Sequence, residues 1–207
     1  MVDGDKSPSP RKKELLEKSY RYVLRHGLID MSLRPLAEAI GSSPRVLLFL
    51  FGSKDGLVRE LLARAREAEI AMLQTVAQQG HTDLAEIASG LWQWLSDAQH
   101  RDLLYLWVEA YGRSLTTPQG PWGGFAESTV RDWLQLLQEH QPEHFGSTAA
   151  AAQQRTRILA VLRGALLDLL ATGETARVTA AVEHEPHNRA RCRGQALRQP
   201  CHRRGGD

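Results

Sequence analysis

Apolar residues recur along most of the chain at intervals of three and four positions, which places them on one face of a helix. This spacing predicts helices over residues 11–26, 33–40, 44–50, 53–79, 82–97, 101–114, 125–140, 149–171 and 174–182. The sequence contains no run of alternating apolar and polar residues that would favour a strand, and no internal repeat. We therefore expect an all-α fold.

Serine, proline and glycine mark several boundaries of these helices. Ser32 and Ser43 stand where a hydroxyl oxygen can accept a hydrogen bond from a free N–H at a helix start, and Pro44 fits the first helical position. Gly27 stands where a helix commonly ends. The sequence TTPQGPWGG at 116–124 contains two prolines and three glycines, so it predicts an interior loop that could act as a flap.

The formal net charge is +2, but the charge is unevenly distributed along the chain. Residues 11–66 contain twelve Lys and Arg against six Asp and Glu, whereas residues 67–185 contain seven against fifteen. Residues 186–207 contain six against one. A basic N-terminal quarter followed by an acidic body predicts a small module that binds a polyanion and a larger part that does not.

Two short predicted helices inside the basic segment have the spacing of a helix-turn-helix. They cover residues 33–40 and 44–50, and the three-residue turn between them, 41–43, contains Gly41. In this motif the second helix enters the major groove of DNA, where the base edges carry a readable pattern of donors and acceptors. The basic segment is therefore a candidate DNA-binding module.

Residues 15–57 resemble the DNA-binding domain of the TetR family of bacterial repressors. The resemblance rests on the stretch SLRPLAEAIGSSPRVLLFLFGSKDGL, with Ala37 and Gly41 at small turn-packing positions and Leu47 and Phe51 at core positions. Its most specific part is the closing element Phe-x-Ser-Lys-Asp-x-Leu. The later run RGALLDLLATGETARVTAAV is similar to C-terminal helices of the family. The resemblance implies a three-helix DNA-binding domain joined by a long helix to a helical ligand-binding and dimerisation domain.

Composition and resemblance together suggest four segments. They are a disordered leader over 1–10, a helix-turn-helix domain over 11–53, a ligand-binding and dimerisation domain over 54–183, and a basic tail over 184–207. The tail contains six arginines and no apolar periodicity. It is either a disordered functional extension or the product of a gene read out of frame near its end.

By position in the resemblance, DNA contacts fall on both short helices and on the start of the long helix. The candidate residues are Arg34, Ser42, Ser43, Pro44, Arg45, Leu48 and Lys54. The chemistry supports the cations, because Arg and Lys neutralise phosphates and the helix start at Lys54 also favours anions.

The second helix departs from the family pattern. Where members carry Tyr and a polar or His residue, this chain has Leu48 and Leu50. Few side chains can then read bases by hydrogen bonds, which predicts weak discrimination, or readout through thymine methyl groups and DNA shape. A bidentate contact of Arg45 with guanine would contribute roughly 1–3 kcal/mol of discrimination. Alternatively, the two leucines are core residues and the DNA contacts are in doubt.

All five tryptophans lie between residues 92 and 133, among other aromatic residues. They predict either a packed aromatic core or an apolar pocket for a small molecule, since ligand sites usually have apolar and aromatic walls. The resemblance implies an inducer pocket in this domain. The candidate ligand-binding residues are Trp92, Leu103, Trp107, Tyr111, Phe125 and Trp133.

The helix predicted over 149–171 has apolar residues on more than one face. Such a helix needs cover on two sides, and a two-fold dimer supplies the second side. The resemblance implies a four-helix homodimer interface, for which the candidate residues are Ile158, Leu162, Ala165, Leu166 and Leu169. A dimer would also set two recognition helices about 34 Å apart, as successive turns of the major groove require.

Patterns for catalysis, cofactors and membranes are absent or weak. There is no phosphate-binding loop, nucleophile elbow or dinucleotide fingerprint, so we expect no enzyme activity and no cofactor. The HQPEH sequence at 140–144 matches a zinc-peptidase pattern, but Pro142 would end the helix that such a site needs. The chain has no long apolar run and no signal peptide, so we expect a cytoplasmic protein without a membrane span. Cys192 and Cys201 are confined to the tail, so we expect no disulfide in the body of the protein. We also expect no bound metal.

Two functions fit this sequence. The first is a TetR-like dimeric transcriptional regulator, most simply a repressor that binds palindromic operator DNA and is released by an apolar small-molecule ligand. The second is a helical ligand-binding or interaction protein with a degenerate DNA-binding domain. The salt dependence of DNA binding separates them, because each neutralised phosphate contributes about −0.9 to the slope of log K against log salt.

Overall fold

The structure is a computed structural model in which residues 9–79, 83–141 and 147–184 are described. It is built from helices, and the described residues contain no strand, which confirms the all-α prediction. The helices are α1 (Pro10–His26), α2 (Leu33–Ala39), α3 (Pro44–Phe51), α4 (Lys54–Ala77), α5 (Leu84–Ser96), α6 (Arg101–Thr116), α7 (Phe125–Glu139) and α9 (Ala149–Thr172), followed by a helical segment over 175–184. A short 3-10 helix, η1 (Ala98–His100), precedes α6.

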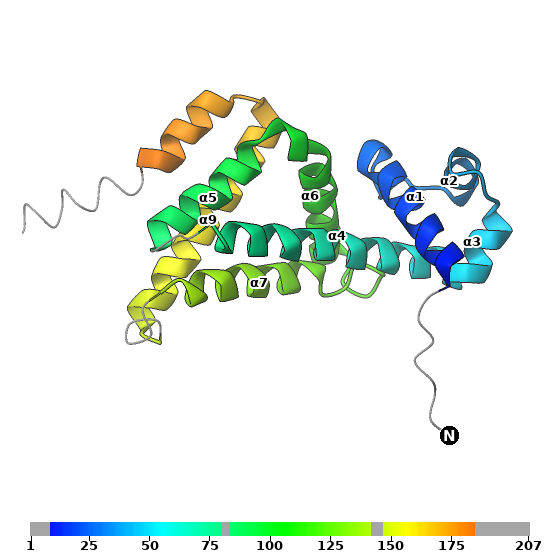
Figure 1. The fold of residues 1–207 in the computed structure, drawn as a ribbon, viewed down its shortest axis with the longest axis horizontal. Coiled ribbons are helices and arrows are strands. Elements are labelled where there is room, and N and C mark those ends of the chain that lie inside the picture. The colour runs from blue at the N-terminus through cyan, green and yellow to red at the C-terminus, as the bar shows by residue number, and fades with distance from the viewer. Residues whose placement is uncertain (1–8, 80–82, 142–146, 185–207) are drawn as a thin grey trace, which may run out of the picture.

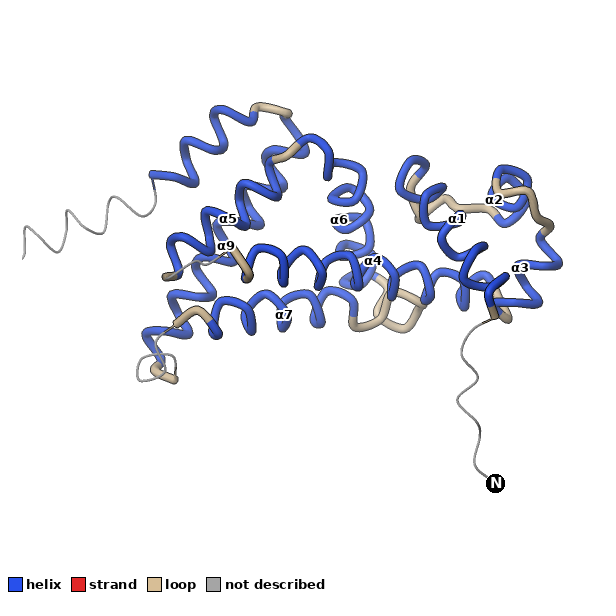
Figure 2. The backbone as a smooth tube through the Cα atoms, in the orientation of Figure 1, coloured by secondary structure: helices blue, strands red, loops and turns tan. Residues whose placement is uncertain are grey.

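The helices form two packed groups that share α4 (Figure 1). Helices α1, α2 and α3 lie together at one end, and α4 runs from this end into a body made with α5, α6, α7 and α9. Only short turns connect most of the helices (Figure 2). At about 1.5 Å per residue, the 24 residues of α4 span about 36 Å, so one helix contributes to the cores of both groups.

Serine caps and one glycine fix the geometry of the helix-turn-helix. The Oγ of Ser43 accepts a hydrogen bond from the N–H of Val46 (3.3 Å) at the start of α3. Gly41 adopts a φ of 67°, a left-handed conformation that other residues rarely adopt, and the turn closes with a hydrogen bond from the N–H of Ser42 to the carbonyl of Ala37 (2.8 Å). The signals at Gly41 and Ser43 are thus confirmed, whereas Ser32 precedes α2 without a side-chain hydrogen bond to that helix, so the cap expected there is not formed.

Ion pairs and a cation–π contact attach α1 to α4. The Nζ of Lys12 lies 2.6 Å from a carboxylate oxygen of Glu60, and the Nε of Arg64 lies 2.5 Å from one of Glu17. The Arg64 guanidinium also lies over the ring of Tyr20, 4.8 Å from its centroid. These half-exposed contacts orient the two helices around a core of buried leucines, which supplies most of the stabilisation.

The helix boundaries differ slightly from the prediction. Helix α2 ends at Ala39, one residue early, and α6 continues to Thr116. The start of the helix expected over 82–97 lies partly outside the described residues. The loop after α6 is a series of turns in which Trp122 is buried, so the core anchors the segment that we expected to act as a flap.

Neighbouring leucines on α3 provide a test of this packing. Leu47 is 1% exposed and Leu48 is 42% exposed. We expect Leu47→Ala to lower the free energy of unfolding by about 2–5 kcal/mol, because it leaves a cavity in the core. Leu48→Ala should change it by less than about 0.5 kcal/mol. Urea unfolding of both variants measures the difference, and equal losses would show that Leu48 is a core residue.

Candidate functional site

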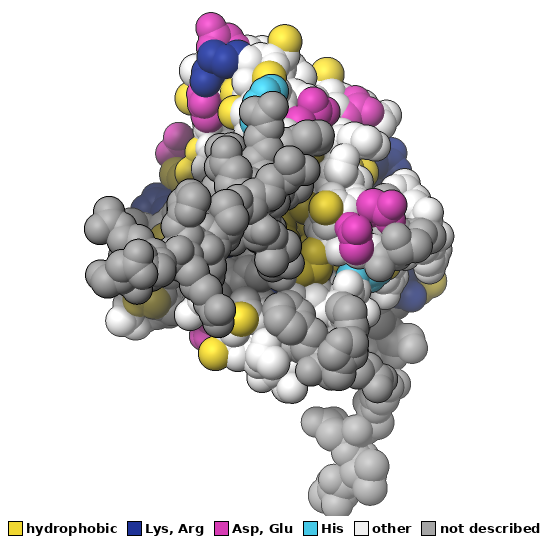
Figure 3. All heavy atoms as spheres, turned by 90° about the vertical axis from the view of Figure 1, so that its left-hand side faces the viewer, with side chains coloured by type: hydrophobic (Ala, Val, Ile, Leu, Met, Phe, Trp, Pro, Cys, Tyr) yellow, Lys and Arg dark blue, Asp and Glu magenta, His cyan; other side chains and the backbone are white. Residues whose placement is uncertain are grey.

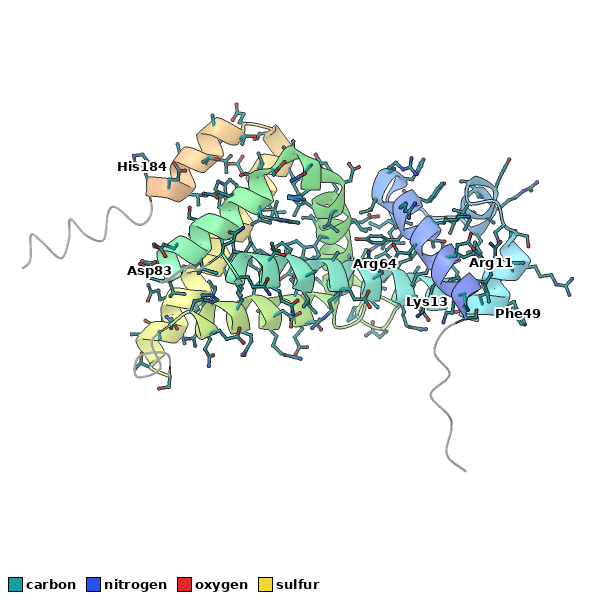
Figure 4. All side chains as sticks on the ribbon, viewed as in Figure 1. Arg11, Lys13, Phe49, Arg64, Asp83 and His184 are labelled. Atoms are coloured by element: carbon teal, nitrogen blue, oxygen red, sulfur yellow. The ribbon has the colours of Figure 1, made fainter. Side chains whose placement is uncertain are left out.

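The outer face of α3 is apolar and unpacked. Leu47 and Phe51 point into the core, so the residues between them on the opposite face are turned to solvent. Phe49 is 85% exposed, and Leu48 and Val46 are also exposed. Figure 4 shows Phe49 at the end of the molecule formed by α1, α2 and α3. This face is available to a partner such as the major groove.

Three exposed cations lie on α2, on α3 and at the start of α4. Arg34 lies on α2, Arg45 on the first turn of α3, and Lys54 is the first residue of α4. Within the described part of the chain, none of the three forms an ion pair. On the face drawn in Figure 3, acidic side chains lie among Lys and Arg side chains on the described surface.

The serines proposed as DNA contacts are less available than the cations. The Oγ of Ser42 is buried and has no hydrogen-bond partner among the described residues, so this hydroxyl does not reach the outer face and we withdraw it as a direct contact. Ser43 uses its Oγ as the cap of α3, and Pro44 is the half-exposed first residue of that helix. Backbone groups here, rather than hydroxyls, are open to a phosphate.

Sequence analysis missed Val46 and Phe49 as candidate contact residues. The signal was present, because Leu47 and Phe51 are one helical turn apart and were recognised as core positions. A residue midway between two core positions must point away from the core. Leu48 stays a candidate contact, whereas Leu50 is half-buried and packs against the core.

A cavity lies between α4, α5 and α6. It has a volume of about 250 Å³ when its open mouth is counted, and its enclosed part has room for about one water molecule. Two of the predicted ligand-binding residues, Leu103 and Trp107, line it. The full lining consists of Ala65, Glu69, Met72, Trp94, Leu103, Leu104 and Trp107.

The carboxyl group of Glu69 is buried in the wall of this cavity. The residue is 4% exposed, and its oxygens accept hydrogen bonds from Trp133 Nε1 (2.6 Å), Trp107 Nε1 (3.0 Å) and Thr129 Oγ1 (3.2 Å). Burial raises the pKa of Glu69 to about 7, although the three donors act to lower it, and the nearby charge of Asp132 raises it further. A buried group that titrates near neutral pH is a candidate functional residue.

Sequence analysis also missed Glu69, although its position was informative. The buried residues Leu62, Ala65, Met72 and Val76 follow one another on α4 at helical spacing, and Glu69 completes their stripe. A charged residue at a core position of an amphipathic helix indicates either an internal ion pair or a site. The sequence alone did not show which groups would surround it.

The remaining predicted ligand-binding residues lie around the cavity without lining it. Trp133 stacks on Trp107 with 5.4 Å between ring centroids. Trp92 faces the last helical segment and donates a hydrogen bond from Nε1 to Thr179 Oγ1 (3.0 Å). The hydroxyl of Tyr111 accepts a hydrogen bond from Arg163 of α9, and Phe125 is buried at the start of α7. The assignment of these residues to a ligand site stays a prediction.

A carboxylate on α6 connects the body to the group formed by α1, α2 and α3. Glu109 accepts hydrogen bonds from the backbone N–H groups of Leu28 (3.0 Å) and Ile29, in the loop between α1 and α2. Glu109 lies half a turn along α6 from Trp107, which lines the cavity. Helix α6 thus lines the cavity and also holds the loop that precedes α2.

The apolar stripe of α9 is divided between two environments. Leu162, Leu166 and Leu169 are buried within the single chain, so their apolar character needs no partner subunit. Ile158 and Ala165 are half-buried. The exposed face of the helix carries mostly small residues and Leu167, which is 53% exposed; the others include Ala152, Thr156, Ala160, Gly164 and Ala171.

The described residues show neither a metal-binding cluster nor a membrane-spanning helix. No group of His, Cys, Asp or Glu side chains within the described ranges is arranged to hold a metal ion. In the zinc-peptidase-like sequence, His140 and Gln141 are described, whereas residues 142–144 and the arginine-rich tail lie outside the described residues. None of the helices in the described part is long and apolar enough to cross a membrane.

The raised pKa of Glu69 predicts a pH-dependent stability. Between the usual pKa of 4.5 and about 7, the folded protein retains a proton that the unfolded chain has lost. The free energy of unfolding should therefore fall as pH rises through this range, by up to about 3 kcal/mol. Glu69→Gln should remove this part of the pH dependence.

Urea unfolding between about pH 5 and pH 8 measures this effect. Glu67→Gln, an exposed position on the same helix, provides a matched control that should keep the wild-type dependence. Asp132 and Arg163 are the charged groups that interact with Glu69 from α7 and α9, and both variants retain them. An identical pH profile for the two variants would contradict the role of Glu69.

Comparison with known proteins identifies the fold. No protein-family model and no curated protein sequence matches the chain. A TetR transcription regulator from Haloarcula marismortui is 16% identical with a TM-score of 0.67, covering 86% of this chain and 95% of its own. A transcriptional regulator from Rhodococcus sp. Rha1 is 20% identical with a TM-score of 0.68, covering 83% and 91%. The multidrug binding protein EbrR complexed with proflavin is 19% identical with a TM-score of 0.61, covering 84% and 98%. The chain therefore has the fold of TetR-family transcriptional regulators, with a helix-turn-helix group joined through a long helix to a helical body.

Proposed function

We propose that this chain is a homodimeric transcriptional repressor that binds operator DNA through α2 and α3 and releases it when a small molecule occupies the cavity beside α6. The observation that carries the proposal is the outer face of α3, which is exposed within the described part of the chain; the exposed cations Arg34, Arg45 and Lys54 lie on the same group of helices. A helix with this exposure fits the major groove, and the cations can neutralise phosphates.

The structures that share the fold support the same function. Those reported above are transcriptional regulators or, for EbrR, a multidrug binding protein with a bound organic compound. In this chain the cavity lined by Trp107 is the corresponding candidate for a ligand site. The proposal extends these likenesses to DNA binding and ligand response.

Helix α6 provides a physical route between the two sites. A ligand larger than a water molecule has to move a wall of the cavity, and Trp107 of α6 is part of that wall. A shift of α6 also moves Glu109, which holds the loop before α2 through two backbone N–H groups. The ligand can change DNA binding only as far as it binds the two arrangements with different affinity.

The exposed apolar residues of α3 predict the manner of base recognition. Phe49 and Leu48 have no hydrogen-bonding groups, but their side chains can contact thymine methyl groups in the major groove. Arg45 is the exposed side chain of α3 that can donate hydrogen bonds to a base edge. We propose that the operator is recognised through thymine contacts, DNA shape and a contact of Arg45.

A salt titration of DNA binding tests the proposal. Fragments from a random library enriched by the full-length protein should bind it with an affinity that falls steeply as salt rises. We expect Lys54→Ala to weaken binding and to reduce the slope of log K against log salt by about 1, through the loss of one phosphate contact. Arg131→Ala, which removes an exposed cation on α7, is the control and should leave the slope unchanged.

A flat salt response, or enrichment of no sequence, would favour the second candidate function. In that case the exposed Val46, Leu48 and Phe49 would form a contact surface for another protein, in a helical ligand-binding protein that does not bind DNA. The apolar character of this face is the observation that keeps the second candidate open.

The homodimer is a separate part of the proposal. Small residues on the exposed face of α9 allow a second helix to approach closely, and Leu167 can pack into that contact. We expect the wild-type protein to have twice the chain mass of 23.1 kDa in light scattering, and Leu167→Glu to shift it to the monomer mass because a buried unpaired charge is costly. Leu115→Glu introduces the same change at another exposed leucine, on α6, and should remain dimeric.

A further inference from the structure

Helices α1 and α4 begin at the same end of the molecule. Lys12 of α1 pairs with Glu60 of α4. Glu17, just over one turn further along α1, pairs with Arg64, one turn further along α4. Because the contacts advance in the same direction along both helices, α1 and α4 run in roughly the same direction where they meet. Their N-terminal ends therefore lie on the same side of this contact, near α3 (Figure 1).

The start of α1 also packs against the end of α3. The Nζ of Lys12 lies 5.4 Å from the centroid of the ring of Phe51, which is the last residue of α3. In Figure 4, Arg11 and Lys13 lie at the same end of the molecule as Phe49, the most exposed apolar residue of α3. The first turn of α1 is thus a neighbour of the helix that we propose to enter the major groove.

Lys12 takes part in these internal contacts, whereas the cations on either side of it face solvent. Arg11 and Lys13 are both exposed. Arg11 forms an exposed ion pair with Glu14 (2.8 Å), a kind of pair that contributes little to stability, and Glu14 also pairs with Lys18 (2.7 Å). Lys13 forms no ion pair with any described residue. Both side chains are therefore available to an anionic partner.

The neighbouring start of α4 supplies little net charge by itself. Its first two residues, Lys54 and Asp55, are both exposed and have opposite charges. The excess positive charge at this end of the molecule therefore comes from α1. A helix in the major groove has a phosphate backbone along each side, so cations on a neighbouring helix are placed for phosphates rather than for base edges.

We propose that the DNA interface extends to the first turn of α1, where Arg11 and Lys13 bind phosphates of the backbone beside α3. This inference rests on the proposed function, because it names further DNA-binding residues for the same protein. Each cation neutralises one phosphate and releases its counterions. Because a phosphate contact carries no sequence information, this part of the interface adds affinity and leaves sequence discrimination to α3.

A salt titration with the enriched DNA fragment tests this contact. In the full-length protein, the double variant Arg11→Ala, Lys13→Ala should reduce the slope of log K against log salt by about twice as much as Lys54→Ala does, because two phosphate contacts are lost instead of one. Its binding to the enriched fragment and to a scrambled fragment should weaken by the same factor. The double variant Arg11→Lys, Lys13→Arg keeps both charges and should keep the wild-type slope.

Arg21→Ala is the matched control, because it removes an exposed cation from the second half of the same helix and should leave the slope unchanged. An unchanged slope in the double alanine variant would overturn the proposal, and so would an equal loss in Arg21→Ala. A changed ratio between the two fragments would also contradict it, since that result indicates base contacts. If the double alanine variant loses helical content, the single variant Lys13→Gln decides, with an expected loss of slope equal to that of Lys54→Ala.

The same titration separates this proposal from the proposed function. A wild-type protein that binds no DNA would contradict both. A wild-type protein with a steep salt response that depends on Lys54 but not on Arg11 and Lys13 would support the repressor function and contradict the contact by α1.

Discussion

The arrangement of the whole molecule depends on the burial of α4 by two different sets of helices. Around Glu60 and Arg64 this helix pairs with α1, and only two residues later Arg66 pairs with Asp132 of α7. The two hydrophobic cores therefore meet within one turn of a continuous helix. Any rotation of the group formed by α1, α2 and α3 against the body must bend α4 or move it as a unit, which limits the number of relative orientations.

The second link between the two groups is polar. Glu109 reaches from α6 to the loop after α1, where it satisfies backbone N–H groups that would otherwise be left without a partner at the end of a helix and turn. Together, α4 and α6 hold the group formed by α1, α2 and α3 at two points. A displacement of α6 while α4 stays in place would tilt this group rather than translate it.

The burial of Glu69 is difficult to explain by stability alone. Its raised pKa means that the charged carboxylate opposes folding at neutral pH, and an apolar side chain of similar size would pack against the same indoles without this cost. The three donors offset part of the desolvation and hold the carboxylate in a single orientation. Removing the carboxyl group would also leave the two indole N–H groups and the Thr129 hydroxyl without this acceptor.

The sequence predicted the helices and the helix-turn-helix well because their signals are local. Ser43, Gly41 and the spacing of Leu47 and Phe51 act within one or two turns, and their effects do not depend on distant residues. The contacts that define the candidate sites are not local. Glu69 meets side chains more than thirty residues away along the chain, and nothing in the apolar pattern specifies which helices will face one another.

The same limitation explains the interpretation of α9. Two neighbouring apolar faces on a helix indicate that other elements pack against both faces. The sequence does not show whether the element on the second face belongs to the same chain. Leu162, Leu166 and Leu169 turned out to be covered internally by the body. The exposed face that remains is recognised by its small side chains, a weaker signal than an apolar stripe.

The bond between Glu109 and the loop before α2 has a consequence for how the protein can vary. Because the carboxylate accepts hydrogen bonds from main-chain N–H groups, the side chains at positions 28 and 29 do not take part in the link. At the exposed Ile29, substitutions other than proline therefore preserve the link, because proline alone has no N–H to donate, whereas Leu28 is also held by the core in which it is buried. The link therefore constrains the acidic side chain at position 109 of α6 more strictly than the side chain at position 29.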